Sequence, residues 1–162
     1  MNESGWQTKV DQLWQRFDDY EPEAFVQAMA RLTSERGPDD PVAAFELGGA
    51  YDSTGHSDVA VEHYRRALQL GLDPGRHRQA VIQLASSLRN LGQVSEGIEL
   101  LERERDARSD ELDDAVVAFL ALALTTVGRE REAAALALSA LAPHLPRYQR
   151  SVASYARAIV DG

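Results

Sequence analysis

Histidines and carboxylates are the residue types in this chain that could bind a metal or carry acid–base catalysis, provided that their spacing brings them together. The four histidines are His56, His63, His77 and His144, and none lies in an H-x-x-x-H or HExxH arrangement that would place two ligands on one helix face. Cysteine is absent, which excludes disulfides, thiolate nucleophiles and cysteine-ligated zinc or iron–sulfur sites. These residues therefore predict neither a metal site nor a cofactor.

Carboxylates gather in three runs, at positions 18–23, 102–106 and 110–114. A pair of carboxylates can act as general acid and base, but no positioned base, nucleophile or phosphate-binding loop accompanies these runs. The run at 110–114 falls in the first turn of a predicted helix, where the helix dipole stabilises negative charge. We therefore expect helix caps and solvated faces at these places, and a protein that is not an enzyme.

Composition narrows the class of protein further. The chain has 162 residues, 44% of them hydrophobic, and a formal net charge of −9. So acidic a chain lacks the clustered basic residues that bind nucleic acid, and it is a poor match to an anionic membrane surface. The start is polar, and the longest apolar run, Ala115–Leu124, is shorter than the roughly 18 residues of a spanning helix. We expect a cytoplasmic protein with no nucleic-acid or membrane partner; its single lysine and many alanines hint at a bacterial source.

A predicted helical segment that ends in glycine occurs three times in the sequence. The glycines are Gly55, Gly92 and Gly128, spaced 37 and 36 residues apart. A small residue stands seven positions before each glycine and another five positions after it: Gly48, Ala85 and Ala121 before, and Ala60, Gly97 and Ala133 after. Small residues let two antiparallel helices approach closely, and a left-handed glycine ends a helix without a Cβ penalty. The sequence therefore predicts repeated helical hairpins, which must stack to bury their apolar faces.

Prolines mark several helix starts, because proline suits the first helical position, and an aspartate just before it is a good N-cap. Pro22, Pro41, Pro74 and Pro146 are interpreted in this way. Together with apolar periodicity they predict about nine helices: 4–19, 22–36, 41–54, 57–71, 74–91, 94–107, 111–127, 130–142 and 146–160.

The first and last helices are amphipathic. The first carries Trp6, Val10, Leu13, Trp14 and Phe17 on one face. We expect Trp6 and Trp14 to form the core of an N-terminal hairpin; the alternative is a dimer interface on this helix, since aromatic residues are enriched at interfaces. The last helix carries its apolar residues on one face, as a helix that caps a stack should: Tyr148, Val152, Tyr155 and Ile159.

The repeated glycines and small residues resemble the pattern of the tetratricopeptide repeat (TPR). The first repeat shows the pattern Leu47-Gly48, Tyr51, Gly55, Ala60, Tyr64, Ala67 and Pro74. The second is looser, with Gly97 and Glu104 in place of alanines, and in the third Ala137 stands where the pattern has an aromatic residue. The resemblance runs from Pro41 to Ala142 and extends to a bacterial subgroup of short TPR proteins without assigned activity.

The resemblance implies an all-α fold, a right-handed superhelix of antiparallel hairpins (a TPR-like α-solenoid). It divides one domain over residues 1–162 into five parts: a degenerate N-terminal hairpin at 1–37, repeats at 41–73, 74–108 and 110–142, and a capping helix at 146–160. The first helix of each pair would line a concave groove. Whether the N-terminal hairpin continues the superhelix or folds over the groove stays open at this point.

The groove implied by the family gathers polar and aromatic residues from three helices. The candidates are Phe45, Glu46, Asp52, Gln79, Gln83, Ser86, Arg89, Asn90, Phe119, Thr125 and Thr126, with Gly49, Ser53 and Leu122 on the same face. Arg89 and Asn90 would hydrogen-bond a peptide carboxylate or backbone; alternatively, Arg89 pairs with Asp52 and stabilises the stack. The family's carboxylate clamp uses paired lysines, and Lys9 is the only lysine, so that clamp is not expected.

The sequence thus predicts a protein- or peptide-binding scaffold whose partner it does not identify. A few aromatic or arginine anchors would supply most of the binding energy, with Phe45, Arg89, Asn90 and Phe119 as candidates. The alternative is a homodimer that uses the groove or the first helix as its interface.

Overall fold

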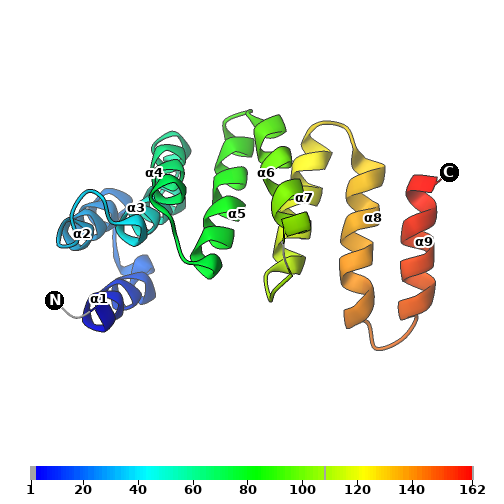
Figure 1. Ribbon diagram of the computed structural model, residues 1–162, viewed down its shortest axis with the longest axis horizontal. Coiled ribbons are helices and arrows are strands. Elements are labelled where there is room, and N and C mark those ends of the chain that lie inside the picture. Colours follow the sequence, from blue (N-terminus) through cyan, green and yellow to red (C-terminus); the bar gives the residue numbers. More distant parts are fainter. Residues whose placement is uncertain (1–2, 108, 162) are drawn as a thin grey trace. The chain divides into compact units, whose positions relative to one another are not determined.

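The structure, a computed structural model, describes residues 3–107 and 109–161, and within these ranges all regular secondary structure is helical. Arg108, at the end of the predicted second repeat, lies outside the described residues. The elements (Figure 1) are α1 (Glu3–Gln15), η1 (Phe17–Asp19), α2 (Pro22–Ser34), α3 (Pro41–Ser53), α4 (Ser57–Leu70), α5 (Pro74–Asn90), α6 (Val94–Ala107), α7 (Asp113–Thr126), α8 (Glu130–Leu141), η2 (Ala142–His144) and α9 (Gln149–Asp161). The chain forms two compact units, Met1–Ser87 and Leu88–Gly162, and the boundary falls inside α5. The single domain and the right-handed superhelix therefore stay predictions.

Seven of the nine predicted helices agree with the structure to within two residues at either end. The first helix is shorter than predicted: α1 ends at Gln15, and 17–19 form a separate 310 turn. The start predicted at Pro146 is wrong, because Leu145 is extended, as the residue before a proline prefers, and Tyr148 has a positive φ of 68°. Consequently α9 begins only at Gln149.

Side-chain caps explain why α3 and α5 begin where they do. The Asp40 carboxylate accepts a hydrogen bond from the Ala43 backbone N–H at 2.8 Å, and Pro41 occupies the first helical position. Asp73 likewise accepts from the backbone N–H groups of Gly75 and Arg76, each at 3.1 Å. These carboxylates satisfy donors that the helix itself leaves free.

The three turn glycines have the same local structure. Gly55, Gly92 and Gly128 have φ values of 87°, 77° and 78°, in the left-handed region. In each case the residue after the glycine donates its N–H to a carbonyl five residues earlier, as from His56 to Tyr51 at 2.9 Å. This is the Schellman arrangement, which ends a helix while satisfying its last carbonyl groups. The repeated glycines therefore set identical helix ends, as the sequence predicted.

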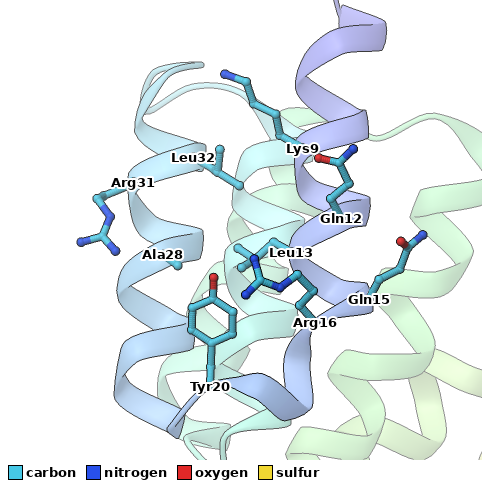
Figure 2. A pocket seen from close by; sticks show the side chains of 9 residues that line it. All are labelled: Lys9, Gln12, Leu13, Gln15, Arg16, Tyr20, Ala28, Arg31 and Leu32. Atoms are coloured by element: carbon cyan, nitrogen blue, oxygen red, sulfur yellow. The ribbon is translucent and has the colours of Figure 1, made fainter.

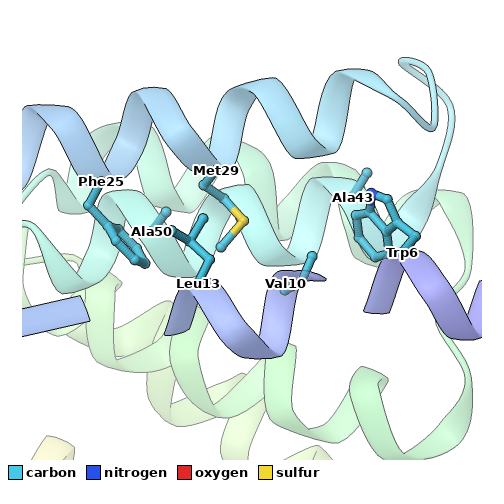
Figure 3. Close-up of a cluster of buried hydrophobic side chains, with 7 residues drawn as sticks. All are labelled: Trp6, Val10, Leu13, Phe25, Met29, Ala43 and Ala50. Carbon is cyan, nitrogen blue, oxygen red and sulfur yellow. The ribbon is translucent and has the colours of Figure 1, made fainter. Parts of the chain in front are cut away.

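In the first unit, the N-terminal hairpin pairs α1 with α2 through η1 (Figure 2). Its core contains Trp6, Val10, Leu13, Phe25 and Met29 (Figure 3), and the same cluster includes Ala43 and Ala50 from α3. Trp6 is 2% exposed, and its indole N–H donates to the Leu32 carbonyl at 2.8 Å. Trp6 is therefore a core residue, as expected, and it is not available for an interface.

The α3–α4 hairpin closes where Gly48 meets the Tyr64 ring. A Cβ added at Gly48 would lie 2.9 Å from both Tyr64 Cδ1 and Tyr64 Cε1, and 3.2 Å from His63 Cβ. Tyr64 itself is fully buried. The predicted need for a small residue at this crossing is thus a direct steric requirement.

In the second unit, α6 packs on α7, α7 on α8, and α8 on α9. The arginine of α8, Arg131, donates from Nε and Nη2 to the Ile159 carbonyl at the end of α9, at 3.1 and 2.6 Å. Ala156 is the buried residue of α9, whereas Tyr148 and Tyr155 are 75% and 71% exposed. The sequence predicted Tyr148 and Tyr155 on the apolar face of the last helix, and this is wrong for both residues. Tyr148 precedes the helix, and Tyr155 is exposed.

Gly48→Ala is expected to lower the free energy of unfolding by about 1–3 kcal/mol, because the new methyl group must displace the Tyr64 ring in a packed hairpin. The control is Gly5→Ala, in α1 with no atom within 4 Å of the added Cβ, which should raise stability by about 0.5 kcal/mol through helix propensity. Urea denaturation measures both changes. Equal effects of the two substitutions would show that the Gly48–Tyr64 contact is not the constraint.

Candidate functional site

A polar hollow of about 500 Å³ lies on the first unit, between side chains of α1, α3 and α5. Its lining residues are Trp14, Phe45, Glu46, Gly49, Asp52, Ser53, Gln79 and Gln83. All except Trp14 belong to the face that the sequence predicted as the groove. α1 therefore contributes a side chain to the same hollow as α3 and α5. Whether the N-terminal hairpin continues the superhelix stays a prediction.

Trp14 forms one wall of the hollow and is the functional candidate that sequence reasoning did not assign to the groove. Its indole N–H donates to Glu46 Oε2 at 2.8 Å. A Cβ added at Gly49 would lie 3.2 Å from Trp14 Cζ2, so the glycine makes room for the indole. The available signal was Gly49 beside Gly48: a second glycine in a helix interior costs stability unless another group approaches there.

Glu46 is 8% exposed, and among the described residues its carboxylate accepts hydrogen bonds from neutral donors. Trp14 donates to Oε2, and Gln7 Nε2 donates to Oε1 at 3.4 Å. Gln7 in turn accepts from Arg76 Nη2 at 3.0 Å, while Arg76 Nη1 forms an ion pair with Asp73 at 2.9 Å. Burial raises the pKa of Glu46 above its ordinary value, although the hydrogen bonds and the charge of Arg76 act in the opposite direction.

Asp52 lies at the centre of a second hydrogen-bonded group. Ser87 Oγ donates to Asp52 Oδ1 at 2.8 Å, and the Tyr64 hydroxyl lies 3.5 Å from Oδ2 and also hydrogen-bonds Gln83 Oε1. Burial raises the pKa of Asp52, and burial together with the nearby Asp52 charge raises that of Tyr64 strongly. Within the part of the chain that the structure describes, neither Asp52 nor Glu46 forms an ion pair.

The other predicted groove residues are placed differently. Phe45 is 8% exposed and packs 6.1 Å from the Tyr64 ring centroid, so most of its surface belongs to the core. Ser86 is half-buried and does not line the hollow. In the second unit, Phe119 is half-buried, and the exposed Thr125 and Thr126 donate their hydroxyl groups to the Leu122 carbonyl. Their roles in binding stay predictions.

Arg89 and Asn90 lie at the end of α5, in the second unit. Arg89 is half-buried, and its Nε has no hydrogen-bond partner among the described residues. Asn90 is exposed. An ion pair between Arg89 and Asp52 stays a prediction, and so does recognition of a peptide carboxylate by Arg89 and Asn90.

A second hollow, of about 460 Å³, lies between α1 and α2 and carries three basic side chains (Figure 2). Lys9 forms an ion pair with Glu35 at 3.1 Å, and Arg16 forms one with Asp19 at 3.0 Å while lying over the Tyr20 ring. Arg31 points away from α1 (Figure 2). The cations are directed to separate places, so they do not form an anion site.

A third hollow, of about 480 Å³, lies between α7 and α8 and is lined mostly by small apolar residues. Ala118 and Ala137 stand there at the repeat positions that Phe45 and Tyr64 occupy in the first repeat. The equivalent residues of the second repeat, Ile82 and Leu101, are also large and buried. The third repeat therefore leaves open a space that the other two fill.

His63, His144, Asp113 and Asp114 make contacts with neighbouring side chains or backbone. His63 stacks on Tyr51 with ring centroids 5.4 Å apart, and burial lowers the pKa of its imidazole. His144 Nε2 lies 2.8 Å from Asp114 Oδ2, and Asp113 accepts a hydrogen bond from the backbone N–H of Asp110, in the turn before α7, at 3.1 Å. In the described ranges, no three metal-ligating side chains gather, and no helix is long and apolar enough to cross a membrane.

Asp52→Asn is expected to raise the free energy of unfolding at pH 7, with the gain over wild type shrinking as the pH falls toward 3.8, the ordinary pKa of the group. The folded pKa is raised, so between the two values the native state holds more protons, and stability declines as the pH rises. Asparagine can still accept from Ser87 and can donate to the Tyr64 oxygen. Urea denaturation over a pH series measures the difference, with Glu99→Gln, exposed on α6, as the control for loss of one charge. A gain that does not change with pH would contradict this account.

Ala137→Leu is expected to raise the free energy of unfolding by about 0.5–2 kcal/mol, because the new side chain fills part of the α7–α8 hollow. Ser139→Leu controls for helix propensity and hydrophobicity, because Ser139 is exposed on the same helix as Ala137 but does not line the hollow. Thermal unfolding followed by circular dichroism compares the two. A loss of stability in Ala137→Leu alone would mean that the hollow cannot accept a larger side chain.

Comparison with known proteins gives the same architecture. A family model described as "Tetratrico peptide repeat" matches residues 41–159. The crystal structure of a putative kinesin light chain with nearly identical TPR-like repeats, from Podospora anserina, superimposes with a TM-score of 0.69 at 16% identity, over 98% of this chain and 96% of that chain. A single-substitution variant of those repeats gives the same values, and no curated protein matches. Since the family model covers more than half of the sequence, this chain belongs to the tetratricopeptide repeat family, and its fold is the all-helical TPR-like solenoid.

Proposed function

We propose that this protein is a non-enzymatic scaffold that binds a peptide segment of another protein in the hollow formed by α1, α3 and α5. The observation that carries the proposal is the hollow itself, where three helices of one packed unit direct polar side chains into one concave space. Its volume of about 500 Å³ is in the range of ordinary ligand sites. TPR domains generally mediate protein–protein interaction, which agrees with this role.

The lining of the hollow favours a peptide over a compact small molecule. Its polar groups come from several turns of helix and are spread along the face: Glu46, Asp52 and Ser53 on α3, and Gln79 and Gln83 on α5. Gln79 and Ser53 are exposed at the rim, whereas Glu46 is buried. An extended peptide can contact the exposed groups at the rim and the buried groups at the floor one after another. One of its side chains would enter the hollow as an anchor.

Self-association is the second candidate function, and the first helix no longer favours it. Trp6 is buried in the core, and Trp14 is engaged with Glu46, so α1 does not present the pair of tryptophans on which that interface depended. Light scattering over a concentration series tests for a homodimer directly.

Ser53→Trp is expected to weaken peptide binding by about tenfold or more, because an indole at this exposed rim position occupies the hollow without entering the core. A library of random displayed peptides is selected on the wild-type protein, and the enriched sequences are then titrated by calorimetry. Gln69→Trp, exposed on α4 and not among the lining residues, is the matched control.

Equal affinity for wild type, Ser53→Trp and Gln69→Trp would place the peptide elsewhere and contradict the proposal. Failure to enrich any peptide on the correctly folded protein would contradict it as well.

A further inference from the structure

Among the described residues, the lining of the hollow includes two carboxylates and no cationic side chain. Glu46 and Asp52 both line it, and every hydrogen bond they accept comes from a neutral group: Trp14, Gln7, Ser87 or Tyr64. The positive charge that acts on Glu46 is that of Arg76, whose guanidinium is engaged by Asp73 and Gln7. The space between the two carboxylates is therefore electrostatically suited to a positive charge that the described chain does not supply.

The uncharged residues that line the hollow favour one kind of cation, a guanidinium group, over an ammonium group. Trp14 presents an indole beside the carboxylates, and the face of an indole attracts a cation, most often the planar guanidinium of arginine. Gln79 contributes an amide at the exposed rim. A guanidinium has five N–H donors in a fixed plane, so it can hydrogen-bond a carboxylate while it stacks on a ring. An ammonium group would satisfy the charge but not the stacking.

We infer that the hollow is a specificity pocket for an arginine side chain of the partner, which pairs with Asp52 and stacks on Trp14. This inference rests on the proposed peptide-binding function and names the anchor that the hollow takes. Glu46 acts from the floor: its carboxylate is buried and held by Trp14, so it orients the indole and adds negative potential. The protein as a whole has a formal net charge of −9, which favours the approach of a basic segment.

The raised pKa of Asp52 has the same cause, since burial without a cation disfavours its charged form. A bound guanidinium would replace water near the carboxylate and stabilise the ionised state. Tyr64 on α4 and Ser87 on α5 hydrogen-bond Asp52, and Gln83 on α5 accepts from the Tyr64 hydroxyl; all three are uncharged at neutral pH. Binding of the cation should therefore weaken when Asp52 is protonated.

The test uses the full chain labelled with fluorotryptophan, which gives two fluorine resonances because the sequence contains two tryptophans. Trp14 lines the hollow, and Trp6 is buried in the core as an internal control. Trp14→Phe assigns the two signals. The probe is an acetylated and amidated Gly-Arg-Gly peptide, compared with the same peptide containing citrulline, which keeps the shape of arginine without its charge.

The expected result is a saturable shift of the Trp14 resonance with the arginine peptide, and an affinity at least about tenfold weaker for citrulline. The Trp6 resonance should not move. Asp52→Asn should weaken binding of the arginine peptide by a similar factor, while the urea midpoint shows that the variant is folded. Glu99→Gln, which removes a carboxylate outside the hollow, should bind as wild type does.

Equal binding of arginine and citrulline, or an unchanged affinity in Asp52→Asn, would overturn the inference. Peptide selection distinguishes this failure from failure of the proposed function. Enriched peptides that lose affinity in Ser53→Trp but carry no arginine would leave the peptide site in place and refute the arginine pocket. An absence of enriched peptides, together with no shift at Trp14, would refute both.

Discussion

The contact between Gly48 and the Tyr64 ring is the constraint on which the first unit depends. It sets how closely α3 and α4 approach, since no larger residue than glycine leaves room for the ring. The same tyrosine then carries its hydroxyl to Gln83 on α5 and toward Asp52 on α3. One side chain therefore joins the apolar packing of a hairpin to the polar floor of the hollow, and a change in the crossing would move the carboxylate as well as the core.

The N-terminal hairpin gives the hollow its second wall. Its core is shared with α3 through Ala43 and Ala50, so the hairpin is docked as a part of the unit and not as an appendage (Figure 3). This docking brings Trp14 against Gly49 and Glu46. The α1–α2 pair lacks the glycine pattern of the repeat, yet it completes the surface to which α3 and α5 contribute.

Two desolvated carboxylates in one concave face reduce the stability of the fold, because burial disfavours their charged forms. Features that lower stability without a structural benefit are typical of binding surfaces. The third repeat differs in kind: its alanines leave an unfilled space, with no charged group buried there. The hollow of the first unit therefore favours a charged or polar group, whereas the α7–α8 hollow favours an apolar one.

The sequence by itself determined seven of the nine predicted helices to within two residues and the glycine turns that end three of them. These depend on local rules of periodicity, caps and left-handed glycines. The family resemblance then implied a shared face for Glu46, Asp52, Gln79 and Gln83, and these four residues line one hollow. Only the tertiary structure decided that Trp14 joins this face, that Phe45 is mostly buried, and that Tyr155 is exposed. Those outcomes depend on how helices distant in the chain pack and what each covers, and the period of a single helix does not contain that information.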